Sequence, residues 1–236
     1  MWDVSQTFIN LLASEDHYFE YSVAFGNATA DEGFREGDVT SVNAEYMSFP
    51  DDPSVGGCFS AELSLTMFKP NMQIPRMAKI RPYVRATNGT VFSEWIPQGV
   101  FWIDTREETS NNDGRDMLNI HAYDSMMKTE ASYPNTSHDW PYTDIDVVEE
   151  IATTLGVDVD SRTYDVMTHG YEISLPAGYS MREVLSNIAA MYGGNWVMNY
   201  GGDLLLIAVN SIPPETNYLI DNVGNAITFG GDRILV

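Results

Sequence analysis

The sequence has few basic residues, a single cysteine and no long apolar run. It contains 12 Lys and Arg against 34 Asp and Glu, for a formal net charge of −22. Nucleic-acid-binding proteins carry a basic patch that neutralises phosphates. The acidic balance of this chain therefore argues against nucleic acid or an anionic membrane surface as a binding partner. No run of about 18 uninterrupted apolar residues occurs, so we expect no membrane insertion.

The scarcity of cysteine and of N-terminal basic residues indicates the cellular compartment in which the chain is made. Cys58 has no second cysteine to pair with, so packing or assembly must stabilise the fold without an internal disulfide. Residues 1–14 contain Asp3 and no Lys or Arg, unlike the start of a secretion signal. At 44% hydrophobic, 236 residues can bury a core. We expect a folded, soluble protein that is synthesised in the cytosol.

Motifs that carry chemistry are also scarce. The histidines at positions 17, 121, 138 and 169 form no pair at metal-ligand spacing. Cys58 has no nucleophile signature around it and is interpreted as a small buried hydrophobe. Asp144 with Asp146, and Asp158 with Asp160, lack the Gly and the distant Glu of a calcium loop and are interpreted as helix caps. We predict no enzyme, no cofactor and no metal site.

Period-two alternation dominates the first half of the chain. It is clearest over 59–67, where apolar and polar residues swap at every step, as in a strand with one buried face. The same pattern predicts further strands at 18–25, 39–49, 78–86, 91–96, 99–106 and 117–123. Asn88-Gly89 predicts a type I′ hairpin turn, and Asp3 with Gln6 predicts a capping box for a helix over 3–13. We expect residues 1–128 to form an antiparallel β-barrel.

The pattern changes after residue 123. The predicted elements are a short helix at 124–130, longer helices at 143–155 and 180–193, and a hairpin at 196–209. Gly156 is the expected stop of the first long helix, and Ser180 with Glu183 forms a capping box for the second. These elements predict a small α+β domain over 129–210. The fold class is therefore α+β and mainly antiparallel β.

Residues 211–236 are typical of the first strands of a second barrel that is incomplete in this sequence. The apolar end over 234–236 would expose an edge strand. We therefore expect either a longer natural chain or another subunit that covers this end.

Aromatic residues on the predicted strands are the candidate subunit-interface residues. They are Trp95, Phe101, Trp102 and Tyr123. In a monomer most such side chains belong to the core, and the remainder anchor contacts between subunits. The sequence does not separate these two roles.

Two runs of the sequence resemble the prophage tail-hub family. Residues 97–103 follow that family's P-x-G-x-F-x-I strand, and residues 120–126 follow its I-x-A-x-D-x-M corner between a strand and a helix. The later helices and the Tyr-Gly-Gly-Asn sequence at 192–195 match as well, so the resemblance extends over 1–236. The family is similar to the hub of contractile tails, to the N-terminal part of tail-associated proteins of long non-contractile tails, and to the base of valine–glycine-repeat spike proteins.

The resemblance implies a non-catalytic structural component of the virion tail. It implies a trimeric hub at the tail tip or baseplate, in which three chains with two related barrels each face a hexameric tube or distal tail ring. The implied partners are copies of the chain, that ring, a tip or fibre protein, and passing DNA without specific binding. Three chains would carry about −66 before screening, so an acidic channel would repel the DNA.

Two other hypotheses stay open. All-β domains with exposed Trp and Tyr often bind sugars, so the chain is alternatively a receptor- or carbohydrate-binding module, which needs a concave site with aromatic platforms. The third hypothesis is a tail-associated hydrolase. In the resembled family such activity usually belongs to a separate C-terminal domain.

Overall fold

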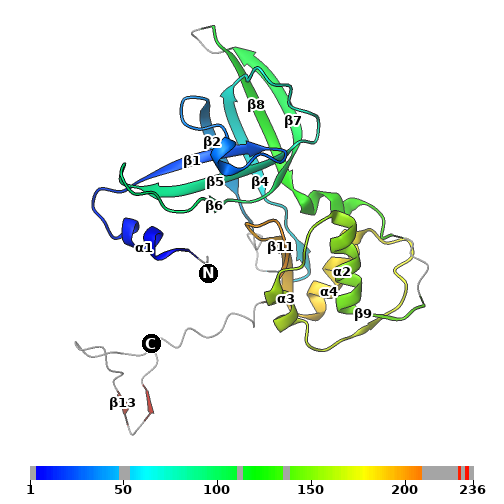
Figure 1. Ribbon diagram of the computed structural model, residues 1–236. Coiled ribbons are helices and arrows are strands. Elements are labelled where there is room, and N and C mark those ends of the chain that lie inside the picture. Colours follow the sequence, from blue (N-terminus) through cyan, green and yellow to red (C-terminus); the bar gives the residue numbers. More distant parts are fainter. Residues whose placement is uncertain are drawn as a thin grey trace.

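The computed structural model describes residues 4–47, 54–110, 114–134 and 139–208, with the backbone of 228–229 and 232–233. These residues form a large antiparallel sheet and a smaller unit of helices and short strands (Figure 1). This arrangement confirms the predicted α+β class with mainly antiparallel strands.

The large sheet contains seven antiparallel strands. Its order is β1 (Tyr18–Phe25), β5 (Lys79–Thr87), β7 (Phe101–Ser110), β8 (Asp116–Asp124), β4 (Glu62–Phe68) and β2 (Val39–Glu45), and β6 (Ile96–Pro97) pairs with β5 outside this path. Along β4 the alternation appears as expected, because Leu63, Leu65 and Met67 are buried while the residues between them are more exposed.

The sheet curls around a core, but no ladder of strands closes it among the described residues. β1 and β2 stand at the two ends of the hydrogen-bonded order. Two contacts link the edges of these strands. Phe34, in the segment between them, forms an isolated β-bridge with Val23 of β1, and the hydroxyl of Tyr21 on β1 donates to the carbonyl of Val39 on β2 at 3.0 Å. Side chains from both end strands share one core. The predicted strands are thus observed as a curled, open sheet, and the closed barrel is not found in this part of the chain.

The first helix starts at a different cap from the predicted one. Helix α1 spans Gln6–Leu12, and the hydroxyl of Ser5 accepts a hydrogen bond from the backbone N–H of Phe8 at 3.1 Å. Ser5 therefore occupies the N-cap position, and the capping box expected from Asp3 and Gln6 is wrong. Asp3 lies outside the described residues.

The turn after β5 also differs from the expected type I′ turn. Type I′ needs positive φ at two consecutive residues, and only Gly89 has it, at 85°. The side chain of Asn88 instead accepts hydrogen bonds from the backbone N–H groups of Thr90 and Val91, at 3.1 and 2.8 Å. This Asx turn reverses the chain without a left-handed asparagine.

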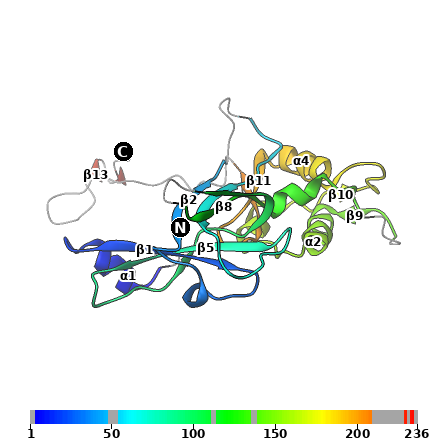
Figure 2. The same ribbon diagram turned by 90° about the horizontal axis from the view of Figure 1, so that it is seen from above.

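The smaller unit packs helices against a three-stranded sheet. Its elements are α2 (Asp144–Leu155), α3 (Ser161–Val166), α4 (Met181–Met191), β11 (Gly194–Met198), β12 (Leu204–Ala208), the 3-10 helix η2 (Ser125–Glu130), and the short pair β9 (Tyr142–Thr143) and β10 (Glu172–Ile173). The other 3-10 helix, η1 (Ala30–Glu32), follows β1 and packs on the large sheet. The third strand is β3 (Gly57–Cys58), which precedes β4 in the sequence and pairs in parallel with β11. Figure 2 shows α2 and α4 gathered at one end of the molecule.

The predicted starts of both long helices and the predicted stop of the first are confirmed, whereas α4 ends at Met191, two residues before its predicted end. Thr143 is the N-cap of α2, and its C-cap Gly156 is left-handed with φ of 72°. Ser180 and Glu183 form the reciprocal capping box of α4. Helix α3 has no counterpart among the predicted elements, and the predicted helix at 124–130 is the 3-10 helix η2.

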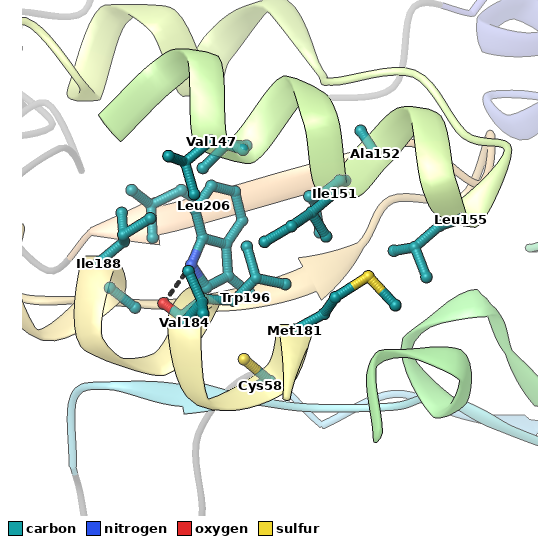
Figure 3. Close-up of a cluster of buried hydrophobic side chains, with 14 of the residues drawn as sticks. Cys58, Val147, Ile151, Ala152, Leu155, Met181, Val184, Ile188, Trp196 and Leu206 are labelled. Atoms are coloured by element: carbon teal, nitrogen blue, oxygen red, sulfur yellow. Dashed lines mark hydrogen bonds between the residues drawn. The ribbon is translucent and has the colours of Figure 1, made fainter. Parts of the chain in front are cut away.

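The core of the smaller unit centres on Trp196. This side chain is fully buried between α2 and α4, and its indole N–H donates to the carbonyl of Leu185 at 2.8 Å (Figure 3). Cys58 reaches the same core from β3, which confirms its predicted burial. The bond to Leu185 satisfies the only polar atom that the large indole brings into the interior.

Two charged side chains fix the chain where it passes between the sheet and the smaller unit, since β3 precedes β4 and η2 follows β8 in the sequence. The carboxylate of Asp124 accepts hydrogen bonds from the backbone N–H of Ala61 at 2.8 Å and from the hydroxyl of Ser60 at 2.7 Å. Asp124 thereby joins the start of β4 to the end of β8, where both strands leave the sheet. Arg182 of α4 donates to the backbone carbonyls of Cys58 and Met126, on β3 and η2.

Of the predicted C-terminal strands, the structure describes only the pair β13 (Thr228–Phe229) and β14 (Asp232–Arg233). The remainder of 211–236 lies outside the described residues, so the second barrel stays a prediction.

Candidate interaction surfaces

The four predicted interface residues lie in different environments. Phe101 is fully buried in the core of the sheet, between Ile80 on β5 and β8. Its side chain therefore has no surface to offer a partner. Trp102 follows it on the same strand and points to the opposite, outer face, because successive side chains of a strand alternate.

Trp102 and Tyr123 belong to one continuous row of side chains on the outer face. Lys79, Trp102, Tyr123, Glu62 and Glu45 are successive cross-strand partners on β5, β7, β8, β4 and β2. All five are partly or fully exposed. We call them the outer row. It runs from a lysine at one end, through two aromatic rings, to two carboxylates at the other.

The end of the outer row at Trp102 is cationic. The ammonium of Lys128 lies 3.5 Å from the ring centroid of Trp102, and that of Lys79 lies 6.0 Å from it. The indole N–H donates to the hydroxyl of Ser125 at 3.0 Å, which fixes the ring. Burial, and secondly the positive charge of Lys79, lower the pKa of Lys128. Two ammonium groups therefore lie against one aromatic ring.

The other end of the outer row is anionic. The carboxylates of Glu45 and Glu62 are direct cross-strand partners, and like charges in this position repel. Each has one local contact: Asn43 donates to Glu45 at 2.8 Å, and the imidazole of His121 lies 3.3 Å from Glu62. Partial burial, and secondly the charge of Glu62, raise the pKa of Tyr123.

Trp95 lies apart from the outer row. Its indole N–H donates to the carboxylate of Asp31 at 2.9 Å, and the guanidinium of Arg85 lies 4.3 Å from its ring centroid. Arg85 is also paired with Glu20 at 2.6 Å. The ring is thus held by contacts within the chain, although it remains partly exposed.

A cleft of about 530 Å³ separates the sheet from the smaller unit. Tyr46, Phe59, Trp95 and Tyr200 lie along it, and the rings of Tyr46 and Tyr200 contact edge to face at 4.7 Å between centroids. Asn199 also lines the cleft, and its side-chain amide is hydrogen-bonded to Asp160 and Asp203. A concave surface with aromatic rings is one feature of carbohydrate-binding sites.

The predicted capping role is confirmed for one residue of each acidic pair, whereas Asp144 is buried within α2 and accepts a hydrogen bond from the hydroxyl of Tyr192. Asp160 is the N-cap of α3, and Asp146 completes the capping box of α2. No cluster of three His, Cys, Asp or Glu side chains able to hold a metal occurs within the described ranges. Burial raises the pKa of the Cys58 thiol, which disfavours its reactive thiolate.

None of the described helices is both long enough and apolar enough to cross a membrane. The longest, α2, has 12 residues.

The fold is similar to those of solved tail proteins, although no family model and no curated protein matches the sequence. The 43 kDa tail protein of prophage MuSo2 from Shewanella oneidensis matches over 86% of this chain and 59% of its own, with a TM-score of 0.55 and 13% identity. A tail protein from Neisseria meningitidis MC58 matches over 89% of this chain and 53% of its own, with a TM-score of 0.51 and 11% identity. A chain of the Francisella PdpA–VgrG complex is less similar, with a TM-score of 0.43.

The chain spans less than two thirds of either tail protein. Both matches nevertheless extend over the sheet and the smaller unit together, since they cover more than four fifths of this chain. The resemblance predicted from residues 97–103 and 120–126 is therefore confirmed at the level of the fold, and the chain has the fold of phage-type tail proteins.

Proposed function

We propose that the chain is a non-catalytic structural component of a phage-type tail tip or baseplate. In this proposal three copies form a hub in the virion tail that joins a hexameric tube or distal tail ring to a central tip or fibre protein. The observation that carries it is the shared fold with the MuSo2 tail protein over 86% of this chain.

The charge of the chain supports a role around a DNA conduit. Beyond the outer row, the outer face of the sheet presents the exposed carboxylate of Glu107, opposite Asn119 on β8. A ring of chains that each carry −22 would repel a passing polyanion and keep it from sticking. We propose that such acidic side chains line the channel of the hub.

Immunogold electron microscopy tests the proposed location. Antibodies raised against the purified chain are applied to particles released from the producing cells. We expect gold at the tip of the tail, at the end distant from the capsid. Gold on the capsid or along the tail shaft, or particles that lack the chain, would refute the assignment.

The cleft lined by Tyr46 and Tyr200 favours a second candidate, a receptor- or carbohydrate-binding module. Saturable binding of isolated host cell-wall polysaccharide by residues 1–236, lost in Tyr200→Ala, would support it over the hub. The hub proposal predicts no such binding.

A further inference from the structure

We propose that the cationic end of the outer row docks onto the anionic end of the outer row in a second copy of this chain. Lys79 and Lys128 of one copy then face Glu45 and Glu62 of the next. This inference rests on the proposed homo-oligomer and identifies which surfaces of the chain meet in it.

The two lysines are set apart from the chain's abundant carboxylates. Arg35, Lys69, Arg85, Arg162 and Arg182 all form ion pairs with Asp or Glu within the described residues. Lys79 and Lys128 form none in that part of the chain, and both sit over the ring of Trp102 instead. Two like charges beside one partly buried ring repel each other. A carboxylate from outside the chain would offset that repulsion.

The anionic end of the outer row lacks basic partners, just as the cationic end lacks acidic ones, among the described residues. Glu45 and Glu62 are cross-strand neighbours, and none of the described Lys or Arg side chains pairs with either. His121 neutralises Glu62 only when it is protonated. Each end of the row thus carries a pair of like charges that an opposite pair would stabilise.

The order of the row makes the contact head-to-tail. The cationic end lies at β5 and η2, the anionic end lies at β4 and the end strand β2, and Trp102 and Tyr123 lie between them. Two different patches that bind each other form a heterologous interface, which closes into a ring when the rotation between copies is right. The paired aromatic rings supply the apolar centre that such contacts use.

A second copy suits the cationic end better than DNA does. Among the described residues two ammonium groups converge there, in a chain whose net charge is −22. Nucleic-acid sites neutralise many phosphates with an extended basic surface. A neighbouring copy offers two carboxylates, which matches the number of lysines.

Charge reversal at each end separately, and then at both, tests the contact. The first variant is Lys79→Glu with Lys128→Glu, the second is Glu45→Lys with Glu62→Lys, and the third combines all four changes. The combined variant keeps the formal net charge at −22. As a control, Lys69→Glu with Arg76→Glu makes the same change in charge as the first variant at exposed positions away from the row. Sedimentation velocity over a concentration series measures assembly, and circular dichroism checks folding.

We expect each one-ended variant to weaken assembly at least about tenfold, because it places like charges across the interface. The combined variant should recover wild-type assembly, and the control should assemble within about threefold of wild type. Assembly of both one-ended variants at wild-type strength would overturn the docking but leave the hub proposal standing. A wild-type chain that never assembles would overturn both the docking and the trimeric hub. Gold label away from the tail tip would count against the hub alone.

A short DNA duplex provides the competing outcome. Titration of the wild-type chain with a fluorescently labelled duplex should show no binding that depends on Lys79 and Lys128. Saturable binding that the first variant abolishes would assign the lysines to nucleic acid and overturn the docking of a second copy.

Discussion

At the scale of single residues, the alternation of side chains decides the roles of two neighbouring aromatics. The sequence places Phe101 and Trp102 on a strand and makes both candidates for an interface. It does not say which of them faces the core, since both faces of β7 carry a large ring at this point. The register with β5 settles it, because Phe101 pairs with the buried Ile80 and Trp102 pairs with Lys79.

Asp124 leads to a prediction about pH. Burial raises the pKa of its carboxyl from 3.8 to about 6, although hydrogen bonds from Ala61, Ser60 and Met126 act in the opposite direction. The folded state therefore binds this proton more tightly than the unfolded state does. Its contribution to stability is fully present below about pH 4 and is lost as the pH rises through about 6.

We compare wild type with Asp124→Asn, which keeps the size of the side chain but does not titrate. Urea unfolding at pH 7 and pH 5 should show wild type gaining about 1 kcal/mol relative to the variant on acidification. At pH 7 the variant should be less stable by about 1–3 kcal/mol, because its amide NH₂ replaces one of the two acceptors. A stability difference that is the same at both pH values would contradict the raised pKa.

At the scale of secondary-structure elements, local signals predicted much of what is observed. Strand β1 has the predicted bounds, and the caps at Thr143, Gly156 and Ser180 lie where they were expected. These features depend on neighbours within four residues, so one sequence reveals them.

Long-range pairing left no such signal. Strand β3 is two residues long and pairs with β11, whose residues lie more than 130 positions later. Helix α3 is only six residues long and has no apolar stripe that would reveal it. The cationic site went unpredicted for the same reason: Lys79 and Lys128 meet at Trp102 only because β5, β7 and η2 come together in space.

The capping box of α4 gives the prediction at this scale. The hydroxyl of Ser180 accepts from the backbone N–H of Glu183 at 3.2 Å, and the carboxylate of Glu183 accepts from the backbone N–H of Ser180 at 2.8 Å. Ser180→Ala removes the first bond and should lower the free energy of unfolding by about 1 kcal/mol.

Ser161→Ala, at the exposed first position of α3, is the matched control and should change stability by less than about 0.5 kcal/mol. Chemical denaturation of both variants at pH 7 measures the difference. Equal stability of the two variants would show that the cap does not stabilise α4.

At the scale of the whole molecule, the fold and the surface underlie our proposal that the chain is a subunit of an assembly. The tail proteins from Shewanella and Neisseria share the arrangement of sheet and smaller unit. The outer row carries complementary charges at its two ends, and the single cysteine leaves no disulfide to stabilise an isolated chain. These features lead us to expect that copies of the chain stabilise one another.

The oligomeric mass of the purified chain tests this expectation most directly. Native mass spectrometry of residues 1–236 near physiological ionic strength, which screens the repulsion between chains of −22, should give three times the 26.4 kDa of one chain. A mass of one chain at every concentration and ionic strength would contradict the account.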